Sequence, residues 1–183
     1  MVKKIVTPLT KEMVEDLHAG DLVEISGVIY GARDAAHKRM QALMDAGQAL
    51  PFEIAASIIY YVGPCPARPG ELIGSAGPTT SGRMDSYTPR LLQLGLAGTI
   101  GKGKRSPTVI AAMRQYRAVY FGAIGGAGAL LASCVRSEKI IAFADLGPEA
   151  IRELVVENFP VIVVIDAQGN NLYESEVKKY RQE

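Results

Sequence analysis

Short apolar runs rich in β-branched and aromatic residues recur along this chain, and each leads through a glycine-containing corner into a stretch with helical periodicity. The clearest runs lie at residues 22–30, 58–62 and 118–121. Runs that are apolar along most of their length are typical of strands buried on both faces, as in a sheet covered by helices. The alternation predicts an α/β fold, with a layered mixed sheet and helices in a single domain over residues 1–183.

Local signals place the other elements. Thr10 is suited to cap a helix at 11–17, and Gly47 and Gly95 are suited to end helices at 33–46 and 84–94. The remaining expectations are helices at 107–115 and 148–154, a weak strand at 73–77, a short strand at 99–103, an apolar segment at 140–143 and a strand at 161–166. A turn at 166–171 then leads into a last short strand or helix.

Composition limits the kinds of partner. Hydrophobic residues make up 48% of the chain and the net charge is +1, so no overall field favours nucleic acid or an anionic membrane. No apolar run is long enough to span a bilayer, and the first nine residues hold no signal-peptide core. The two cysteines, Cys65 and Cys134, fit neither a disulfide framework nor a zinc site, so we expect a cytoplasmic protein.

The densest cluster of anion-binding groups is the segment 77–85, Gly-Pro-Thr-Thr-Ser-Gly-Arg-Met-Asp. A proline corner is followed by three hydroxyls and the start of a helix. Free amides at a helix start, the hydroxyls of Thr79 and Thr80 and the fork of Arg83 suit a carboxylate or a phosphate. The alternative is a helix with an ordinary hydroxyl cap and an exposed arginine.

Arg33 lies at a second corner, between the strand at 22–30 and the helix that follows it. Its guanidinium either reaches a bound carboxylate or pairs at the surface with Asp34 or Asp45. His37 lies about one helical turn further on and could act as an acid or base, but a lone histidine on a helix is more often structural.

Lys102 lies between two glycines in the segment 101–106, where the backbone can approach a ligand and the ammonium can supply a point charge. A solvated basic turn explains Lys104 and Arg105. The segment is not a Walker A motif, because Leu96 stands where its first glycine is required and Gly103 follows the lysine.

The other chemical motifs are excluded or weak. The glycine-rich segment 122–128 does not have the spacing of a dinucleotide-binding loop, and tight packing or a close backbone approach to a ligand or partner explains its glycines. The sequence has no Ser-His-Asp order, no His-Glu-x-x-His motif and no set of residues with metal-ligand spacing. The chain therefore offers anion-binding groups without an obvious electrophile.

Taken together, three motifs resemble the β subunit of class I, iron-sulfur fumarate hydratase and the similar β subunit of tartrate dehydratase. They are Gly-Pro-Thr-Thr-Ser-Gly-Arg-Met-Asp at 77–85, Ala-Arg-Asp-Ala-Ala-His at 32–37 and Gly-Lys-Gly-Lys-Arg-Ser at 101–106. Segments at 125–130, 145–150, 159–161 and 164–166 extend the likeness, so it covers nearly the whole chain.

The resemblance implies a swivelling β/β/α domain that closes over an active site shared with a separate α subunit. In this family the α subunit supplies three cysteines to a four-iron four-sulfur cluster, whose open iron would be the missing electrophile. Cys65 and Cys134 cannot supply three ligands, so the chain is expected to be inactive without that subunit.

The resemblance also implies roles for individual residues. Thr79 would be the base or would orient the substrate, and Asp34 and Asp85 would hold the two arginines. The carboxylates of a small dicarboxylate would be bound by Arg33, Thr80, Arg83 and Lys102.

Three functions remain open at this point. The leading one is reversible hydration of fumarate to (S)-malate, and the nearest rival is dehydration of L(+)-tartrate by the same residues. The third is a non-catalytic anion-binding module, which would require Arg33, Arg83 and Lys102 to face separate surfaces.

Overall fold

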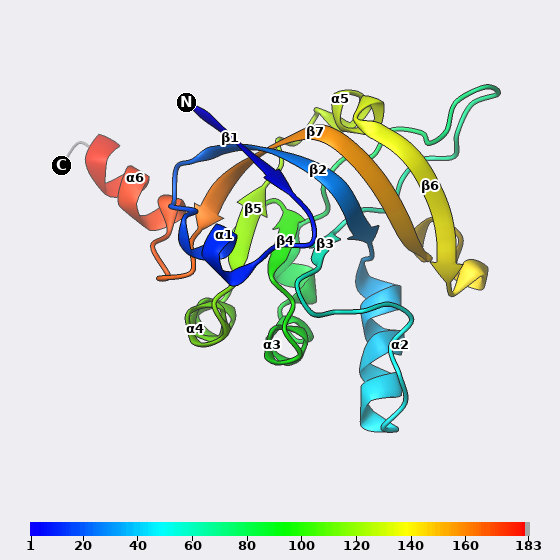
Figure 1. Cartoon of the computed structure of the whole chain (residues 1–183), viewed down its shortest axis with the longest axis horizontal. Coiled ribbons are helices and arrows are strands. Elements are labelled where there is room, and N and C mark those ends of the chain that lie inside the picture. The colour runs from blue at the N-terminus through cyan, green and yellow to red at the C-terminus, as the bar shows by residue number, and fades with distance from the viewer. Residues whose placement is uncertain (182–183) are drawn as a thin grey trace.

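The computed structural model describes residues 1–181 (Figure 1). Seven strands of this part of the chain form one sheet, in the order β1-β2-β3-β4-β5-β7-β6. The strands are β1 (Val2–Val6), β2 (Leu22–Gly31), β3 (Ile58–Tyr60), β4 (Gly98–Gly101), β5 (Val119–Gly122), β6 (Val135–Ala142) and β7 (Ile151–Ile165). The predicted α/β fold with a mixed sheet is confirmed.

Six α-helices and two 3₁₀ helices connect these strands within residues 1–181. The α-helices are α1 (Lys11–Glu15), α2 (Asp34–Asp45), α3 (Thr88–Gln93), α4 (Pro107–Tyr116), α5 (Gly128–Ser133) and α6 (Leu172–Tyr180), and the 3₁₀ helices are η1 (Ser81–Met84) and η2 (Ala144–Glu149). None of the described helices is long and apolar enough to cross a membrane.

Strands β1 to β5 run parallel to one another, whereas β7 runs antiparallel to β2, β5 and β6. Because β2 pairs with both β3 and β7, strands β2, β3, β4, β5 and β7 close into a ring. In Figure 1, β2 and β7 arch over the shorter parallel strands, and α2, α3 and α4 lie on the opposite side of those strands. Antiparallel strands, parallel strands and helices are thus three layers, which is the expected β/β/α arrangement; its swivelling motion stays a prediction.

Both faces of the parallel strands are buried. In β3, Tyr60 points into the ring and packs edge-on against Phe159 of β7, with ring centroids 5.3 Å apart. Ile59 faces the other way and packs with Met40 and Leu91 in a second core beneath the helices. Because the faces are covered, the corners at the strand ends are the places where this layer can present polar side chains to a ligand.

The predicted helix at 148–154 is wrong. Pro148 belongs to η2, and β7 begins at Ile151. Residues 151–156 instead pair with β2 on one side and β6 on the other, which buries Leu154 and Val156 completely or nearly so. Pairing with strands distant in the sequence outweighs the local helical pattern here.

Three further expectations differ from the structure. The weak strand at 73–77 is not formed, and the loop around it contributes two isolated bridges, Val62 with Pro78 and Thr80 with Lys102. The helix at 84–94 is divided into η1 and α3. Strand β1 was not predicted at all, yet it pairs in parallel with residues 22–26. The predictions for the segments at 22–30, 33–46 and 107–115 are confirmed, as β2, α2 and α4.

Candidate active site

The corners after the parallel strands lie together at one edge of the sheet. Arg33 follows β2, Lys102 follows β4, and the glycine-rich segment 123–127 follows β5. The loop that follows β3 carries the hydroxyl-rich segment 77–83 to the same edge. The carboxyl ends of parallel strands are where α/β sheets bind their ligands.

Main-chain hydrogen bonds hold Thr79 and Thr80 beside Lys102. Thr79 N donates to Tyr61 O at 2.7 Å, and Lys102 N donates to Thr79 O at 3.3 Å. Ser81 N donates in turn to Lys102 O at 2.8 Å, so Thr80 and Lys102 form a parallel bridge. The backbone segments that carry Thr79, Thr80 and Lys102, three of the predicted site residues, are therefore hydrogen-bonded to each other.

Asp34 joins the two predicted arginines. Its Oδ1 accepts from Arg83 Nε at 2.7 Å and its Oδ2 accepts from Arg33 Nε at 3.2 Å. Burial alone would raise the pKa of Asp34, but its own backbone amide and the two guanidiniums lower that pKa below its ordinary value. Glu149, 3.5 Å from Arg33 Nε, adds a second carboxylate. Asp34 and Asp85 were expected to share the two arginines, whereas Asp34 contacts both of them.

The glycine-rich segment after β5 packs against the site. A Cβ placed on Gly125 would lie 3.8 Å from Lys102 Cδ and 3.9 Å from Lys102 Nζ. One placed on Gly128 would lie 3.0 Å from Gly77 N, and Ala76 N donates to Gly128 O at 3.0 Å. Because the backbone of Gly77 lies this close to Gly128, position 128 has no room for a side chain.

The loop rests on a buried ion pair that the sequence did not indicate. Arg105 Nε donates to Asp85 Oδ1 at 2.7 Å, and its other nitrogens donate to Thr99 Oγ1 at 3.1 Å and Thr88 Oγ1 at 2.8 Å. The interpretation of Arg105 as part of a solvated basic turn is therefore wrong, because its side chain is buried. The expectation that Asp85 holds one of the site arginines is wrong too, since its described partners are Arg105 and the amide of Ser106.

His37 is buried beneath this edge in a neutral state. Burial lowers its pKa to about 4. Its Nδ1 lies 2.9 Å from Arg33 O, so Nδ1 carries the proton and donates to that carbonyl. The ring packs against Tyr61 and Tyr87, at centroid distances of 5.4 and 5.9 Å. These contacts support the structural interpretation of His37 rather than a role in proton transfer.

Together these contacts place three cations and two hydroxyls on one edge. Thr80, Arg83 and Lys102 are exposed, and Thr79 and Arg33 are partly so. Two separate carboxylates could bind here, because arginine forks and a lysine at different points can each receive one. Thr79 Oγ1 has no hydrogen-bond partner within residues 1–181, so the described residues provide no group that activates it.

A family model for the fumarase C-terminus matches residues 2–176. The chain belongs to this family. It is 40% identical over 177 residues to a Methanocaldococcus jannaschii protein named as a subunit beta of L(+)-tartrate dehydratase, covering 93% of this chain and 91% of that relative. It is 38% identical over 165 residues to fumarate hydratase 2 of Leishmania major and 39% identical over 154 residues to the aerobic class I fumarate hydratase of Escherichia coli K12.

The relatives of this fumarase C-terminus chain differ in length. The match covers 89% of this chain but 29% of the Leishmania protein, and 83% of this chain but 28% of the Escherichia coli protein. The chain thus spans less than a third of those two enzymes. The relatives are named as hydro-lyases, and one of them is named as a subunit.

An iron-sulfur cluster does not fit the described residues of this fumarase C-terminus chain. Cys65 lies exposed in the loop after β3 and Cys134 ends α5, and both are free thiols. Within residues 1–181 no group of three or more histidine, cysteine, aspartate or glutamate side chains could hold a metal ion. We therefore assign no step of chemistry to a metal held by these residues.

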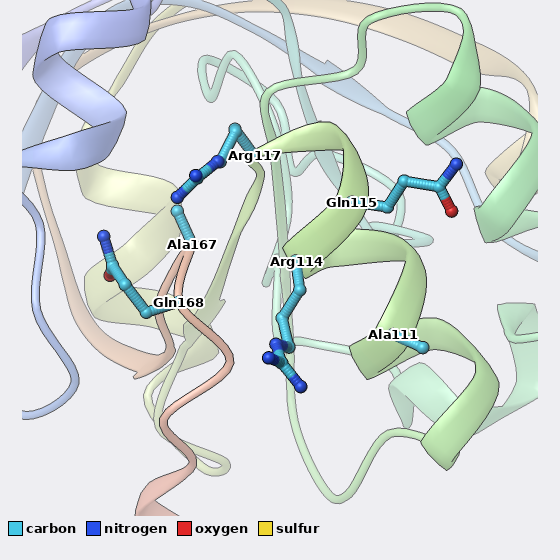
Figure 2. A pocket seen from close by; sticks show the side chains of 6 residues that line it. All are labelled: Ala111, Arg114, Gln115, Arg117, Ala167 and Gln168. Carbon is cyan, nitrogen blue, oxygen red and sulfur yellow. The ribbon is translucent and has the colours of Figure 1, made fainter.

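A separate hollow of about 490 Å³ lies at the other end of β5 (Figure 2). Arg114 and Arg117, at the carboxyl end of α4, line it together with Ala167 and Gln168, and the side chain of Arg117 points toward Ala167. Cations are favoured at this end of a helix by its dipole, which accounts for the two arginines. Because Arg117 precedes β5 and the candidate site follows it, the hollow is no part of that site.

Proposed function

We propose that this chain is the substrate-binding β subunit of an iron-sulfur hydro-lyase, which hydrates fumarate reversibly to (S)-malate together with a cluster-bearing α subunit. The observation that carries the proposal is the contact chain from Arg33 through Asp34 to Arg83, beside the Thr80–Lys102 bridge. This clustering disfavours a non-catalytic module, which would leave the three cations on separate surfaces. The membership of the fumarase C-terminus family supports the same class of reaction.

The cations are proposed to bind the two carboxylates of the substrate. Arg33 and Arg83 use Nε to contact Asp34, which leaves their terminal nitrogens to donate to a ligand. Lys102 and Thr80 lie beside each other and would receive the second carboxylate. A ligand held at both ends has a fixed central carbon pair, as a stereospecific addition of water requires.

Thr79 is proposed to face that central carbon pair, as the base that exchanges a proton with it. A threonine hydroxyl is a weak base at its ordinary pKa, so this role requires activation by the substrate environment or by a partner residue. Orientation of the substrate is the other role that its position supports.

The electrophile is proposed to be supplied by the α subunit. An iron-sulfur cluster there would act as a Lewis acid on the substrate hydroxyl, while the residues of this chain hold the carboxylates. The two free cysteines fit a reducing compartment, which supports the proposal that the assembled enzyme is cytoplasmic.

Dehydration of L(+)-tartrate is the second candidate reaction. The relative that this chain covers almost completely is named as a subunit beta of L(+)-tartrate dehydratase. The two reactions use the same pair of carboxylates and differ by one substrate hydroxyl, so the same four binding residues serve either.

The test is to purify the tagged chain with its native partner under anaerobic conditions, and to assay fumarate and L(+)-tartrate side by side. We expect hydro-lyase activity from the complex, none from the isolated chain, and a loss of about a hundredfold or more in kcat/KM for Arg83→Ala. Arg136→Ala is the matched control, because Arg136 is similarly exposed and also forms one surface ion pair, with Glu157. Turnover by the isolated, iron-free chain would overturn the proposal.

A further inference from the structure

Apolar side chains gather in a groove between β1, the start of β2, the end of β7 and α5. We call it the α5 groove and define it by Val2, Leu22, Ile124, Leu130 and Ile162. Its volume is about 250 Å³, and Glu24 is the one charged residue that lines it in the described structure. The groove is thus far more apolar than the candidate active site.

The α5 groove is exposed to an unusual degree. The exposed fractions are 66% for Ile124, 59% for Leu130, 48% for Leu22 and 45% for Val2. Apolar side chains scattered singly over a surface need no explanation, but contiguous apolar patches mark sites that bind proteins, membranes or ligands.

The groove continues directly into the candidate active site. Ile124 precedes Gly125, and a Cβ on Gly125 would lie 3.8 Å from Lys102 Cδ. A protein that covers Ile124 would therefore also reach the edge where Lys102 and Thr80 lie. The groove therefore lies where a partner that contributes to the active site would bind.

The long relatives indicate which protein would cover the α5 groove. The matched segment is described as the fumarase C-terminus and makes up 28–29% of the Leishmania and Escherichia coli enzymes, so most of their chain precedes it. The match begins at Val2, and Val2 itself lines the groove. In a longer relative whose fumarase C-terminus starts at the corresponding residue, the preceding chain would enter beside this surface.

We propose that the α5 groove is the docking surface for the cluster-bearing α subunit, which corresponds to the preceding part of the long relatives. This inference rests on the proposed function. Glu24, whose carboxylate lies 3.5 Å from Lys4 Nζ, borders the groove without placing an unpaired charge in it. The partner surface is accordingly apolar where it meets Ile124 and Leu130.

The test uses the full chain and the iron-containing subunit that restores hydration of fumarate or dehydration of L(+)-tartrate. The double variant Ile124→Asp/Leu130→Asp should bind this subunit at least about a hundredfold more weakly than the wild type. Its kcat at saturating subunit should stay near that of the wild type, because neither residue contacts the substrate in the proposed site. The control, Leu94→Asp/Val177→Asp, adds the same charge at exposed fractions of 48% and 59%, directly after α3 and on α6 (Figure 1).

The outcomes separate this inference from the proposed function. Equal binding by both double variants overturns the docking surface while leaving the proposed function intact. A wild-type chain that dimerises through the groove, with the Ile124→Asp/Leu130→Asp variant monomeric, assigns the surface to a second copy and also overturns it. If no iron-containing subunit restores hydration, both fail. Should the aspartate variant unfold, Ile124→Ser/Leu130→Ser gives the same comparison.

Discussion

Arg83 Nε donates to Asp34 Oδ1 over 2.7 Å, although 49 positions separate the two residues in the sequence. The same carboxylate accepts from Arg33, so one anion at the start of α2 holds two guanidiniums that would otherwise repel each other. The relationship orients both cations before any substrate arrives. Orientation of this kind reduces the entropy lost on binding.

Replacing Asp34 with asparagine should therefore impair substrate binding more than it impairs folding. For Asp34→Asn we expect kcat/KM of the assembled enzyme to fall about a hundredfold, mainly through a higher KM, because Arg83 loses its charged anchor and Arg33 keeps only the 3.5 Å contact with Glu149. The free energy of unfolding should change by less than about 1 kcal/mol, since the pair with Arg83 lies at the surface. Steady-state kinetics and urea titration check the two parts.

Asp45→Asn is the control for this variant. Asp45 also forms a surface ion pair on α2, with Arg90, but lies at the other end of the helix. We expect it to retain wild-type kinetics. Equal kinetic losses in the two variants would show that Asp34 acts through helix stability and not through the arginines.

Thr79 can be tested for its two proposed roles with a pair of conservative changes. If the hydroxyl is the base, Thr79→Val should lower kcat by about 10²- to 10⁴-fold with little change in KM, and Thr79→Ser should restore much of the loss. Thr108→Val makes the same threonine-to-valine substitution at an exposed position of α4 and is the control. A raised KM with unchanged kcat in Thr79→Val would instead assign Thr79 to substrate orientation.

The buried ion pair below the loop should dominate stability. Asp85→Asn leaves Arg105 buried without its anionic partner, so the free energy of unfolding should fall by about 3 kcal/mol or more. Glu157→Gln makes the equivalent change in the exposed pair with Arg136 and should cost less than about 1 kcal/mol. Urea titration measures the free energy of unfolding of both variants. Equal losses of this free energy would contradict a special role for the buried pair.

His37 should make the protein less stable at mildly acidic pH. Its pKa is about 4 in the folded chain and near 6.5 when unfolded, so between these values only the unfolded chain binds the proton. Stability should thus fall as pH falls through this window, by up to about 3 kcal/mol in total from this residue. Unfolding free energies at pH 7 and pH 4 measure the loss.

His37→Phe keeps an aromatic ring but removes the titrating group. The difference between its stability at pH 7 and at pH 4 should be smaller than that of the wild type. His18→Phe, at an exposed position, makes the same exchange at the other histidine and serves as the control. An unchanged pH dependence in His37→Phe would show that the acid-sensitive group lies elsewhere.

Local sequence patterns were sufficient for the parts of the molecule that depend on near neighbours. The strand that ends at Gly31 and the helix that follows it place Arg33 where the pattern predicted, and the same holds for Lys102 after β4. A strand buried on both faces and a helix start both have short sequence signals. Whether the placed residues bind substrate as predicted stays a prediction.

The features that sequence missed depend on distant partners. Pro148 at the first turn predicts a helix over the start of β7, whereas the strand forms through pairs with β2 such as Leu22 with Ile162. Arg105 could not be distinguished from Lys104 by local pattern. Its burial depends on Asp85, Thr88 and Thr99, which come together only in the folded loop.

The ring of strands also has a consequence for how the protein is made. β2 completes its pairing only with β7, which lies near the other end of the chain. While β7 is still inside the ribosome, β2 has an open edge, and such edges invite aggregation or chaperone binding. The corner that carries Arg33 is then supported on one side only, so the edge that carries the candidate site is completed only after β7 has been synthesised.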